Sequence, residues 1–366
     1  MKYLRLKDAC EILDSLRVPV TASNREKGKY PYYGANGIQD YISDYIFDDE
    51  LVLLAEDGGN FGSKEKPIAY RVSGKCWVNN HAHVLKPKQG LDVDYLCYSL
   101  MFYKVDGMVN GATRQKLTQT AMKEMKIPMR NMGKQLQIVD ELNRTVNVKE
   151  HRKQQLKLLD ELVKARFVEM FGDVNINDKN WNCELLGELC TIVRGGSPRP
   201  IEQFLGGNVP WIKIGDATYG DSIYLNSTKE HIIEEGVKKS RLVKAGSLIF
   251  ANCGVSLGFA RIITFDGCIH DGWLAMEDID ERLDKVFLLQ ALNQMTEHFR
   301  AIAPVGTQPN LNTAIMKKYK QVIPPIELQR KFIRFLEQID KSKVAIKKSL
   351  DETQILFDSL MQKYFG

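Results

Sequence analysis

The sequence predicts an α+β protein in which two globular domains alternate with two long helices, and in which the helices pair as an antiparallel coiled coil with approximate two-fold symmetry. Three observations predict this fold. The stretch Thr113–Gly172 recurs 194 residues later as Thr307–Gly366 without a net gap. The second half of each copy has the apolar spacing of a long helix, and each copy follows a segment of short apolar runs and glycine-rich turns. Such a repeat defines the architecture before single elements are assigned.

The register of the repeat is set by matched residues along its length. The pairs include Leu117 with Leu311, Gln135 with Gln329, Lys149 with Lys343, Leu162 with Leu356, and Phe171-Gly172 with Phe365-Gly366. We therefore divide the chain into a first globular domain (residues 1–130), a central long helix (131–172), a second globular domain (173–325) and a C-terminal long helix (326–366).

Each globular domain is expected to mix short strands with few helices, the pattern of an α+β fold. The apolar runs Leu51–Ala55 and Leu248–Ala251 lead into turns that contain Gly58 and Gly254, which are predicted to serve backbone shape. Further elements are expected after these turns: strands over Trp77–Leu85 and Cys268–Met276, then helical segments over Tyr95–Tyr103 and Val286–Arg300.

The segments 131–172 and 326–366 are each predicted to be one helix, because neither proline nor glycine interrupts Gln135–Phe171 or Gln329–Phe365 and a glycine follows each. Steps of three and four residues alternate along each helix, as in a coiled coil. These seam positions are Ile138, Leu142, Thr145, Lys149, Arg152, Leu156, Leu159, Val163, Arg166 and Met170 in the first helix, and Phe332, Leu336, Ile339, Lys343, Ile346, Leu350, Thr353, Phe357, Leu360 and Tyr364 in the second.

One amphipathic core helix per copy would also explain this spacing. However, helices of about 35 residues are long, and their narrow apolar seams need an equally long partner. We therefore expect the two helices to pair with each other, with arms of about 50–55 Å.

Composition and cysteine usage are those of an ordinary soluble globular protein, with 44% hydrophobic and 27% charged residues. The seven cysteines are scattered, and none form a C-x-x-C pair, so neither a zinc site nor a disulfide framework is expected. A signal peptide and an apolar run that could span a bilayer are both absent from the sequence, so we expect a cytoplasmic protein without membrane contact.

Positive charge is concentrated in the repeat. The two copies have net charges of +6 and +5, whereas the whole chain is +5 and the remaining segments are therefore about −6. Nucleic-acid-binding domains usually carry a basic patch of their own. If this protein binds nucleic acid, a partner is expected to supply much of the phosphate contact.

Several sequence blocks resemble the specificity subunit of a type I restriction-modification enzyme. In the first half they are Pro31–Ile42 (PYYGANGIQDYI), Leu53–Gly62 (LLAEDGGNFG), Trp77–Leu85 (WVNNHAHVL) and Asn110–Leu117 (NGATRQKL). In the second half they are Val209–Asp216 (VPWIKIGD), Val305–Asn312 (VGTQPNLN) and Ile323–Gln329 (IPPIELQ). The order of domain, helix, domain, helix matches this family over the whole chain.

This resemblance implies a non-catalytic subunit with two target recognition domains, each reading one half of a bipartite site in double-stranded DNA. It also implies that the paired helices are a spacer and a docking surface for two methyltransferase subunits. A restriction and translocase subunit would join through that complex.

The sequence shows little sign of chemistry of its own. The N-P-P-[FY] tetrapeptide of amino-methyltransferases is missing, and Ile323-Pro324-Pro325-Ile326 lacks its polar first residue. A phosphate-binding G-x-x-x-x-G-K-[ST] loop is also missing. His81 and His83 are expected on the same side of a strand, where a metal pair is less favoured than a DNA-facing or hydrogen-bonded pair. We therefore predict no catalytic residue, no cofactor and no metal.

Candidate DNA contacts are polar and aromatic side chains on or beside the glycine-rich loops, including arginine, lysine, asparagine and glutamine, which can form paired hydrogen bonds with base edges. In the first domain they are Tyr32, Tyr33, Asn36, Asn60, Lys64, Asn80, His81, His83, Arg114 and Gln115. In the second domain they are Arg194, Ser197, Arg199, Lys213, Asn252, Ser256, His270, Trp273, Gln308 and Asn310. About half of them are expected to touch DNA, because others close turns or cap helices.

Two other functions remain open at this point. A fused methyltransferase-nuclease acting alone would transfer a methyl group from S-adenosylmethionine without a partner. A structural coiled-coil adaptor would bind scrambled and specific duplexes equally well.

Overall fold

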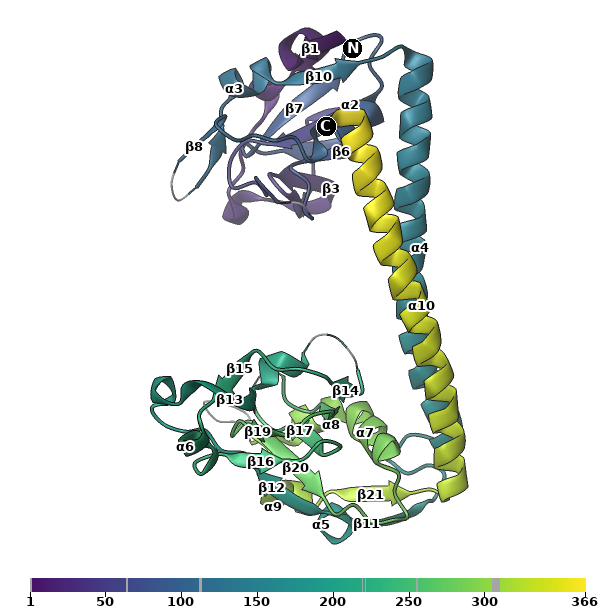
Figure 1. Cartoon of the computed structure of the whole chain (residues 1–366). Helices are drawn as coiled ribbons and strands as arrows, with labels where there is room; N and C mark the ends of the chain where they lie inside the picture. The colour runs from purple at the N-terminus through teal and green to yellow at the C-terminus, as the bar shows by residue number, and fades with distance from the viewer. Residues whose placement is uncertain are drawn as a thin grey trace. The chain divides into compact units, whose positions relative to one another are not determined.

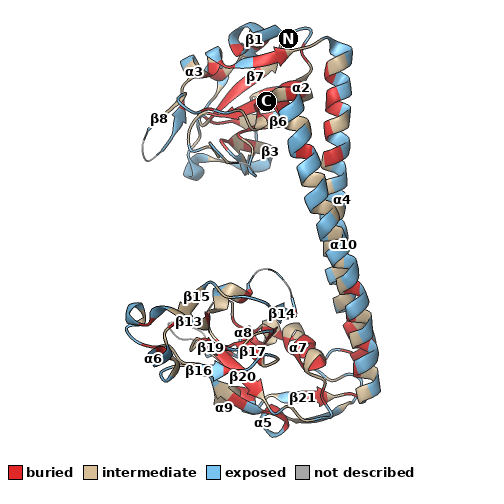
Figure 2. Ribbon diagram, viewed as in Figure 1, coloured by how far each residue is buried: buried red, intermediate tan, exposed pale blue. Residues whose placement is uncertain are grey.

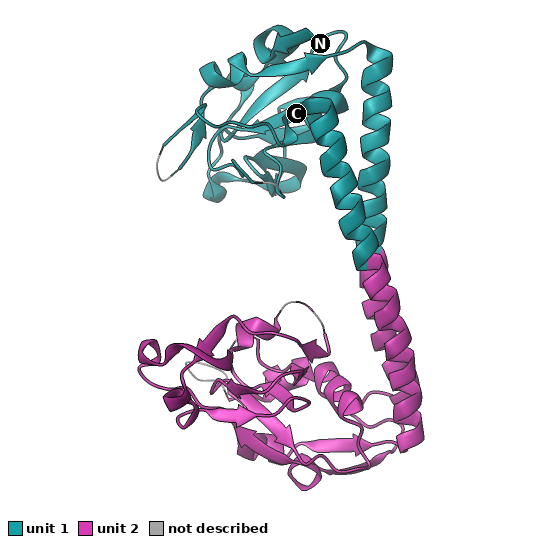
Figure 3. Cartoon of the chain, viewed as in Figure 1, with its two compact units in different colours: residues 1–154, 347–366 teal, residues 155–346 magenta. Residues whose placement is uncertain are grey.

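The computed structural model describes residues 2–63, 65–111, 114–218, 220, 222–254, 256–304 and 310–366. The chain divides into two compact units (Figure 3). The first unit comprises residues 1–154 and 347–366, and the second comprises residues 155–346. Two long helices, α4 (Met132–Phe171) and α10 (Ile326–Phe365), each contribute to both units (Figure 1).

The first unit is built on a six-stranded sheet with the strand order β2-β7-β5-β6-β3-β4. Its strands are β2 (Cys10–Ile12), β7 (Ala82–Pro87), β5 (Phe47–Ala55), β6 (Ala69–Val78), β3 (Lys27–Gly34) and β4 (Gly37–Ile42). Neighbouring strands are antiparallel except β3 and β6, which are parallel. The central strand β5 is apolar at successive positions because both of its faces are buried: Val52 and Leu54 pack in the same core as α2 (Val93–Met101), and Leu51 and Leu53 pack on the opposite face.

The second unit contains a five-stranded sheet and a four-stranded sheet. The first, in spatial order, consists of β12 (Thr191–Arg194), β20 (Trp273–Glu277), β17 (Leu248–Ala251), β18 (Ala260–Ile263) and β14 (Tyr224–Leu225). The second consists of β15 (Glu230–Ile232), β13 (Leu205–Ile212), β19 (Gly267–Ile269) and β16 (Arg241–Val243). In β17, Phe250 packs in the core of α7 (Lys285–Gln294), while Ile249 faces a core shared with the four-stranded sheet. Figure 2 shows the buried strands β7 and β20 at the centres of the two units.

The structure confirms the register of the repeat. A two-stranded sheet joins β1 (Lys2–Arg5) to β10 (Lys126–Met129), and a second joins β11 (Asn182–Leu185) to β21 (Lys320–Ile323). The bounds of β10 and β21 differ by 194 residues, as do those of α4 and α10. Thr113 and Thr307, at the start of the two copies, lie outside the described residues.

A buried glutamine joins the start of each long helix to its globular segment. The Gln135 side chain accepts from the Asp92 N–H (2.9 Å) and donates to the carbonyls of Gly90 (2.9 Å) and Arg130 (2.8 Å). Its repeat partner Gln329 makes the same three kinds of contact, with the Asp284 N–H and the carbonyls of Arg282 and Pro324. Both side chains are completely buried. These two matched glutamines therefore make the same connection between a long helix and its globular segment in both halves of the chain.

The seam prediction is also confirmed, because each of the twenty seam residues is buried or half-buried. In the first unit, Glu141 accepts from the Tyr364 hydroxyl at 2.6 Å, and Lys149 donates to Gln354 and lies over the Phe357 ring at 5.0 Å. In the second unit, Lys343 pairs with Asp160 at 2.6 Å. Phe167 also packs against Phe332 in the second unit. In both units, higher-numbered residues of α4 therefore lie beside lower-numbered residues of α10, so the pairing within each unit is antiparallel.

The predicted second strands are wrong in one respect. The segment Trp77–Leu85 is divided between β6 and β7, and Cys268–Met276 is divided between β19 and β20. The interruptions, at residues 79–81 and 270–272, are loops at the edge of the sheet. Each predicted strand thus spans the ends of two strands, and the residues between those ends belong to the loop clusters described below.

The expected helical segments are present with shifted bounds. The first is α2, and the second is divided into α7 and α8 (Thr296–Ile302). None of the helices in the described residues has both the length and the apolar character that a membrane span requires.

Candidate DNA-recognition surfaces

The first loop cluster lies at one edge of the six-stranded sheet of the first unit. It consists of the β3–β4 turn, the loop after β5, the loop before β7 and residues 114–116. Backbone hydrogen bonds join these segments: Glu56 N–H donates to the His81 carbonyl at 2.9 Å, Gly58 N–H to the Gln115 carbonyl at 3.2 Å, and Leu117 N–H to the Glu56 carbonyl at 2.7 Å. Loops far apart in sequence are thereby assembled into one surface.

The side chain at the centre of this cluster is Asp57. Its Oδ1 lies 2.7 Å from His81 Nδ1 and 2.7 Å from a terminal nitrogen of Arg114. Gly58 has a φ of +60°, and a Cβ on it would lie 3.2 Å from Arg114 Nε. The predicted role of Gly58 in backbone shape is confirmed, and the absence of a side chain also leaves room for the arginine. Gly254 likewise has a positive φ, of +74°.

Further predicted contacts belong to the same cluster. The Asn36 side chain donates to the Gly58 carbonyl at 3.0 Å, and Asn80 is exposed beside His81. Asn60 is half-buried, with its amide 3.5 Å from the Pro67 carbonyl. Lys64 lies outside the described residues.

The second loop cluster lies at the corresponding edge of the five-stranded sheet of the second unit and is centred on Asp271. Its Oδ1 accepts from the Ser197 hydroxyl at 2.8 Å, and its Oδ2 lies 3.5 Å from Arg199. The backbone carbonyl of Asp271 accepts from Arg194 Nε at 3.1 Å. Burial by itself would raise the pKa of the Asp271 carboxyl, but the Ser197 hydrogen bond and neighbouring positive charges hold it below its ordinary value. The carboxylate form is therefore the one that organises these side chains.

The tautomer of His270 follows from a backbone hydrogen bond to its ring. Gly272 N–H donates to Nδ1 at 2.9 Å, so the ring proton is on Nε2, which lies 3.0 Å from Asp271 Oδ1. Burial lowers the pKa of His270 despite the adjacent carboxylate, which favours the neutral ring. Beside it, Lys213 pairs with Glu230 and is about 40% exposed.

The two loop clusters are structurally equivalent. β5 pairs with β7 through Ala55 and Ala82, and β17 pairs with β20 through Ala251 and Trp273. Beyond these pairs, the Asn252 N–H donates to the Gly272 carbonyl, and the Asn252 carbonyl accepts from the Leu311 N–H. Glu56 makes the same two backbone hydrogen bonds in the first unit. Asn310 forms a bridge with Cys253 where Lys116 forms one with Asp57. The backbone frame is thus duplicated, while the side chains on it differ.

Four predicted contacts are corrected, because their side chains lie in the interior: Tyr32, His83, Asn252 and Trp273 are at most 1% exposed. The Tyr32 hydroxyl bonds to the backbone of Val20. The Asn252 amide donates to Asn310 Oδ1 at 3.1 Å and to the Leu311 carbonyl at 3.3 Å. Tyr33 is half-buried against the Tyr70 ring. These residues support the loops from beneath and do not present a group to a ligand.

His83 belongs to a buried ionic network and not to a pair with His81. Its Nδ1 lies 2.6 Å from Asp14 Oδ2, and its Nε2 lies 2.9 Å from the Leu117 carbonyl. Asp14, Glu56 and His83 are close enough to hold a metal ion, but Arg17 already contacts Glu56 at 2.6 Å and Asp14 at 3.6 Å. The carboxylates are therefore neutralised by protein cations. The network connects the start of the chain to the segment that follows Arg114.

The remaining predicted contacts are at or near the surface. Gln115 and Arg194 are exposed, whereas Ser256 and Asn310 are half-buried. Gln308 lies outside the described residues. The prediction missed Asp57 and Asp271, the two carboxylates on which the clusters are built. Their position in glycine-containing loops beside apolar strands was the available signal, but a carboxylate accepts hydrogen bonds and does not resemble the donors that read base edges.

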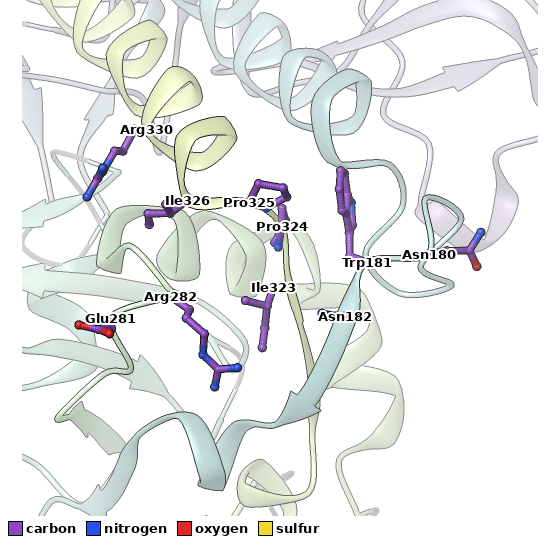
Figure 4. A pocket seen from close by; sticks show the side chains of 10 residues that line it. All are labelled: Asn180, Trp181, Asn182, Glu281, Arg282, Ile323, Pro324, Pro325, Ile326 and Arg330. Carbon is purple, nitrogen blue, oxygen red and sulfur yellow. The ribbon is translucent and has the colours of Figure 1, made fainter.

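A cavity of about 720 Å³ in the second unit lies where β11 and β21 meet the start of α10 (Figure 4). Its arginines are paired: Arg282 contacts Glu184 at 2.7 Å and Asp280 at 2.9 Å, and Arg330 contacts Glu327 at 2.9 Å. None of the predicted DNA contacts is among the ten residues that line it. We therefore do not include this cavity in the recognition surfaces.

The fold and the duplicated loop clusters define a class of protein in which two compact units of strands and helices share two long helices. A family model described as the type I restriction modification DNA specificity domain matches residues 1–158 and 171–354. The chain therefore belongs to the type I restriction-modification DNA specificity family. It is the specificity component of such a system, which recognises DNA and is not itself the catalyst. Specificity subunits of this family work in complexes with methyltransferase and restriction subunits.

Individual relatives cover nearly all of the chain. A Haemophilus influenzae protein that carries the name of a type I restriction enzyme specificity subunit is 29% identical over 359 residues, which cover 93% of this chain and 88% of the relative. The MjaVIII specificity subunit of Methanocaldococcus jannaschii is 20% identical and covers 93% and 86%.

Two solved structures share the fold at 16% sequence identity, each covering 100% of this chain and 96% of the other. One, from work on complex assembly and conformational transition of the type I restriction-modification system, has a TM-score of 0.63. The other, the specificity subunit of M. genitalium, has a TM-score of 0.56.

Proposed function

We propose that residues 1–130 and 173–325 are two target recognition domains, each of which reads one half of a bipartite site in double-stranded DNA. The segments 131–172 and 326–366 are the spacer helices between them. The surface side chains of the first loop cluster contact one half-site, and those of the second contact the other. The exposed candidates for base contacts are Asn36, Asn80, Arg114 and Gln115 in the first cluster, and Arg194 and Arg199 in the second.

The observation that supports this proposal best is the duplicated backbone frame with different side chains. Equivalent loops occupy the same sheet edge in both units, which favours two readers of the same kind. Arg114 is presented from one cluster, whereas Arg194 and Arg199 are presented from the other. Because base pairs are distinguished by their donor and acceptor patterns, different side chains on one frame favour different half-site sequences.

The spacer helices are proposed to dock two methyltransferase subunits and, through them, the restriction and translocase subunits. Leu162 and Leu356, which are matched in the repeat, are 46% and 52% exposed, and Val344 and Ile355 on α10 are more exposed still. Apolar side chains left open on paired helices are typical of an interaction surface. We expect Leu162→Lys and Leu356→Lys each to remove one methyltransferase subunit from the complex, as counted by native mass spectrometry.

Cytoplasmic location is part of the same proposal. All seven cysteines lie in the described part of the chain and are free thiols, which is typical of proteins in a reducing compartment.

The decisive test is a map of methylated positions in DNA from cells that carry this subunit and its methyltransferase. The chain should then be compared with a chimera in which residues 1–130 come from a relative of different specificity. We expect one half-site to change while the other half-site and the spacer stay the same. A change in both half-sites, or in neither, would contradict the assignment of one domain to one half-site. A scrambled duplex bound as well as the mapped site would favour a structural adaptor.

A further inference from the structure

Each loop cluster contains one carboxylate that contacts several candidate recognition side chains at once. Asp57 contacts both His81 and Arg114 through Oδ1. Asp271 contacts Ser197, Arg199 and His270 through its carboxylate. A carboxylate is an unfavourable neighbour for DNA phosphates, so its position at the centre of each surface needs a physical reason.

In the first cluster, the arrangement restrains the arginine without burying it. The Arg114 side chain is 60% exposed, while that of Asp57 is only 17% exposed, so the guanidinium lies on the solvent side of the carboxylate. The hydrogen bond to Asp57 uses one terminal nitrogen of Arg114. A guanidinium has five N–H donors, so others remain available to a base. A free arginine samples many rotamers, and this contact removes part of that freedom before DNA arrives.

We propose that Asp57 and Asp271 are positioning residues for base discrimination, each orienting the arginine and histidine side chains of its own loop cluster while discouraging their contact with phosphate. This inference rests on the proposed function, in which these clusters face DNA. The carboxylates make no base contact in this role and act through the side chains that they hold.

The two carboxylates occupy different positions in the duplicated frame. The strand pairs Ala55–Ala82 and Ala251–Trp273 are equivalent in the two units. When positions are counted from these pairs, Asp57 corresponds to Cys253, and Asp271 corresponds to Asn80. The carboxylate is therefore on the loop after the central strand in one unit and on the loop before the neighbouring strand in the other. Each is expected to affect only the half-site that its own unit reads.

Loss of either carboxylate charge should raise the affinity for unrelated DNA and lower the discrimination between base pairs. The released arginine can turn towards phosphates, so binding to unrelated DNA should become tighter and more dependent on salt. The same release removes the preset orientation that paired hydrogen bonds with a base edge require, so discrimination between base pairs should fall. A residue that only maintained the fold would weaken both kinds of binding together.

The experiment uses complexes of the full chain with its methyltransferase subunits. The variants are Asp57→Asn, Asp271→Asn and Arg114→Gln, and the matched control is Asp44→Asn. Asp44 is exposed in the loop before β5, at the other end of that strand from Asp57, and its side chain accepts only from the Tyr45 N–H among the hydrogen bonds found for it. The probes are a duplex with the site found by methylation mapping, versions with one base pair replaced in either half, and a scrambled duplex of equal length. Fluorescence anisotropy measures binding over a range of salt concentrations.

For Asp57→Asn we expect discrimination against replacements in the first half-site to fall about tenfold. Binding to the scrambled duplex should tighten, and the salt dependence should rise by about one phosphate contact. Asp271→Asn should do the same for the second half-site, and Asp44→Asn should do neither.

Three results would overturn the inference. Parallel weakening of specific and scrambled binding, together with a lower Tm, would assign the carboxylates a structural role only. Normal discrimination in Asp57→Asn with its loss in Arg114→Gln would remove the positioning role but leave the proposed function intact. Normal discrimination in all three variants would show that the loop clusters do not read DNA, and both proposals would fail.

Discussion

Buried polar side chains connect the parts of each unit. Gln135 and Gln329 each satisfy three backbone groups at the junction of a globular segment with a long helix. Asp14 and His83 connect the beginning of the chain to the segment after Arg114. Buried polar groups that are fully paired specify one arrangement, because leaving any of them unpaired is costly.

Replacement of Gln135 by alanine should therefore destabilise the chain strongly. The Asp92 N–H and two carbonyls would lose their partner inside the protein, at a cost of roughly 3 kcal/mol. Urea unfolding of the full chain measures this change. Gln137→Ala, on an exposed position of the same helix, should cost less than about 0.5 kcal/mol. Equal effects of the two substitutions would show that the hydrogen bonds of the buried Gln135 side chain contribute little to the free energy of unfolding.

The Asp14 network predicts a defined acid sensitivity. Burial alone would raise the pKa of Asp14, but hydrogen bonds from His83, Gln119 and the Val84 N–H lower it below its ordinary value of 3.8. A carboxyl whose folded pKa is depressed contributes stability that is fully present above its unfolded pKa and is lost as the pH falls through the folded pKa.

Stability should consequently decline from about pH 4 downward, and Asp14→Asn should remove part of this decline while lowering stability at neutral pH. Urea unfolding at a series of pH values tests this, with Asp44→Asn as the exposed control. If Asp14→Asn and the native chain lost stability in parallel on acidification, the network would not be the source of the sensitivity.

At the scale of elements, the seam explains why the two long helices have the same length and why they pair with each other within each unit. Apolar residues at alternating steps of three and four give each helix one narrow buried stripe, and an antiparallel partner covers it within each unit. Lys149 and Lys343 interrupt the stripe at matched positions. A polar residue in a coiled-coil seam lowers stability and favours one register, and burial lowers the pKa of Lys149.

Lys149→Leu should stabilise the helix pair by about 1 kcal/mol, because a desolvated ammonium is replaced by an apolar group. The midpoint of urea unfolding should rise accordingly. Lys153→Leu removes the same charge from an exposed position and should leave the midpoint nearly unchanged. A loss of stability in Lys149→Leu would show that its contacts with Gln354 and Phe357 outweigh the desolvation of the lysine.

At the scale of the whole molecule, the continuity of α4 and α10 is the feature that matters for a bipartite site. Each helix has 40 residues and contributes to both units, so each is about 60 Å long. We propose that this length sets the distance between the half-sites. Net positive charge is concentrated in the repeat that contains these helices, which is consistent with phosphate contacts supplied by the assembled complex.

Insertion of four residues into both helices, after Arg152 in α4 and after Leu350 in α10, should lengthen the spacer in the recognised site. Four residues extend a helix by about 6 Å and rotate it about 40° beyond a full turn. The added length corresponds to one or two base pairs at about 3.4 Å each. Methylation mapping should show longer spacing and unchanged half-sites. An active insertion variant with the original spacer would exclude the helices as the ruler.

The repeat, the two long helices, their seam and the family are all predictable from the order of the residues alone. These features are periodic or local, so they can be recognised without knowledge of strand order. Which candidate contacts reach the surface depends on how the strands pair and pack in the folded chain. Trp77–Leu85 looks continuous in sequence, yet it divides into two strands, leaving His81 in a loop and His83 in the core. Along a strand, side chains alternate between faces, and strand pairing decides which of them are covered. Asp57 and Asp271 gain their roles in the same way, through loops that meet only when the sheets form.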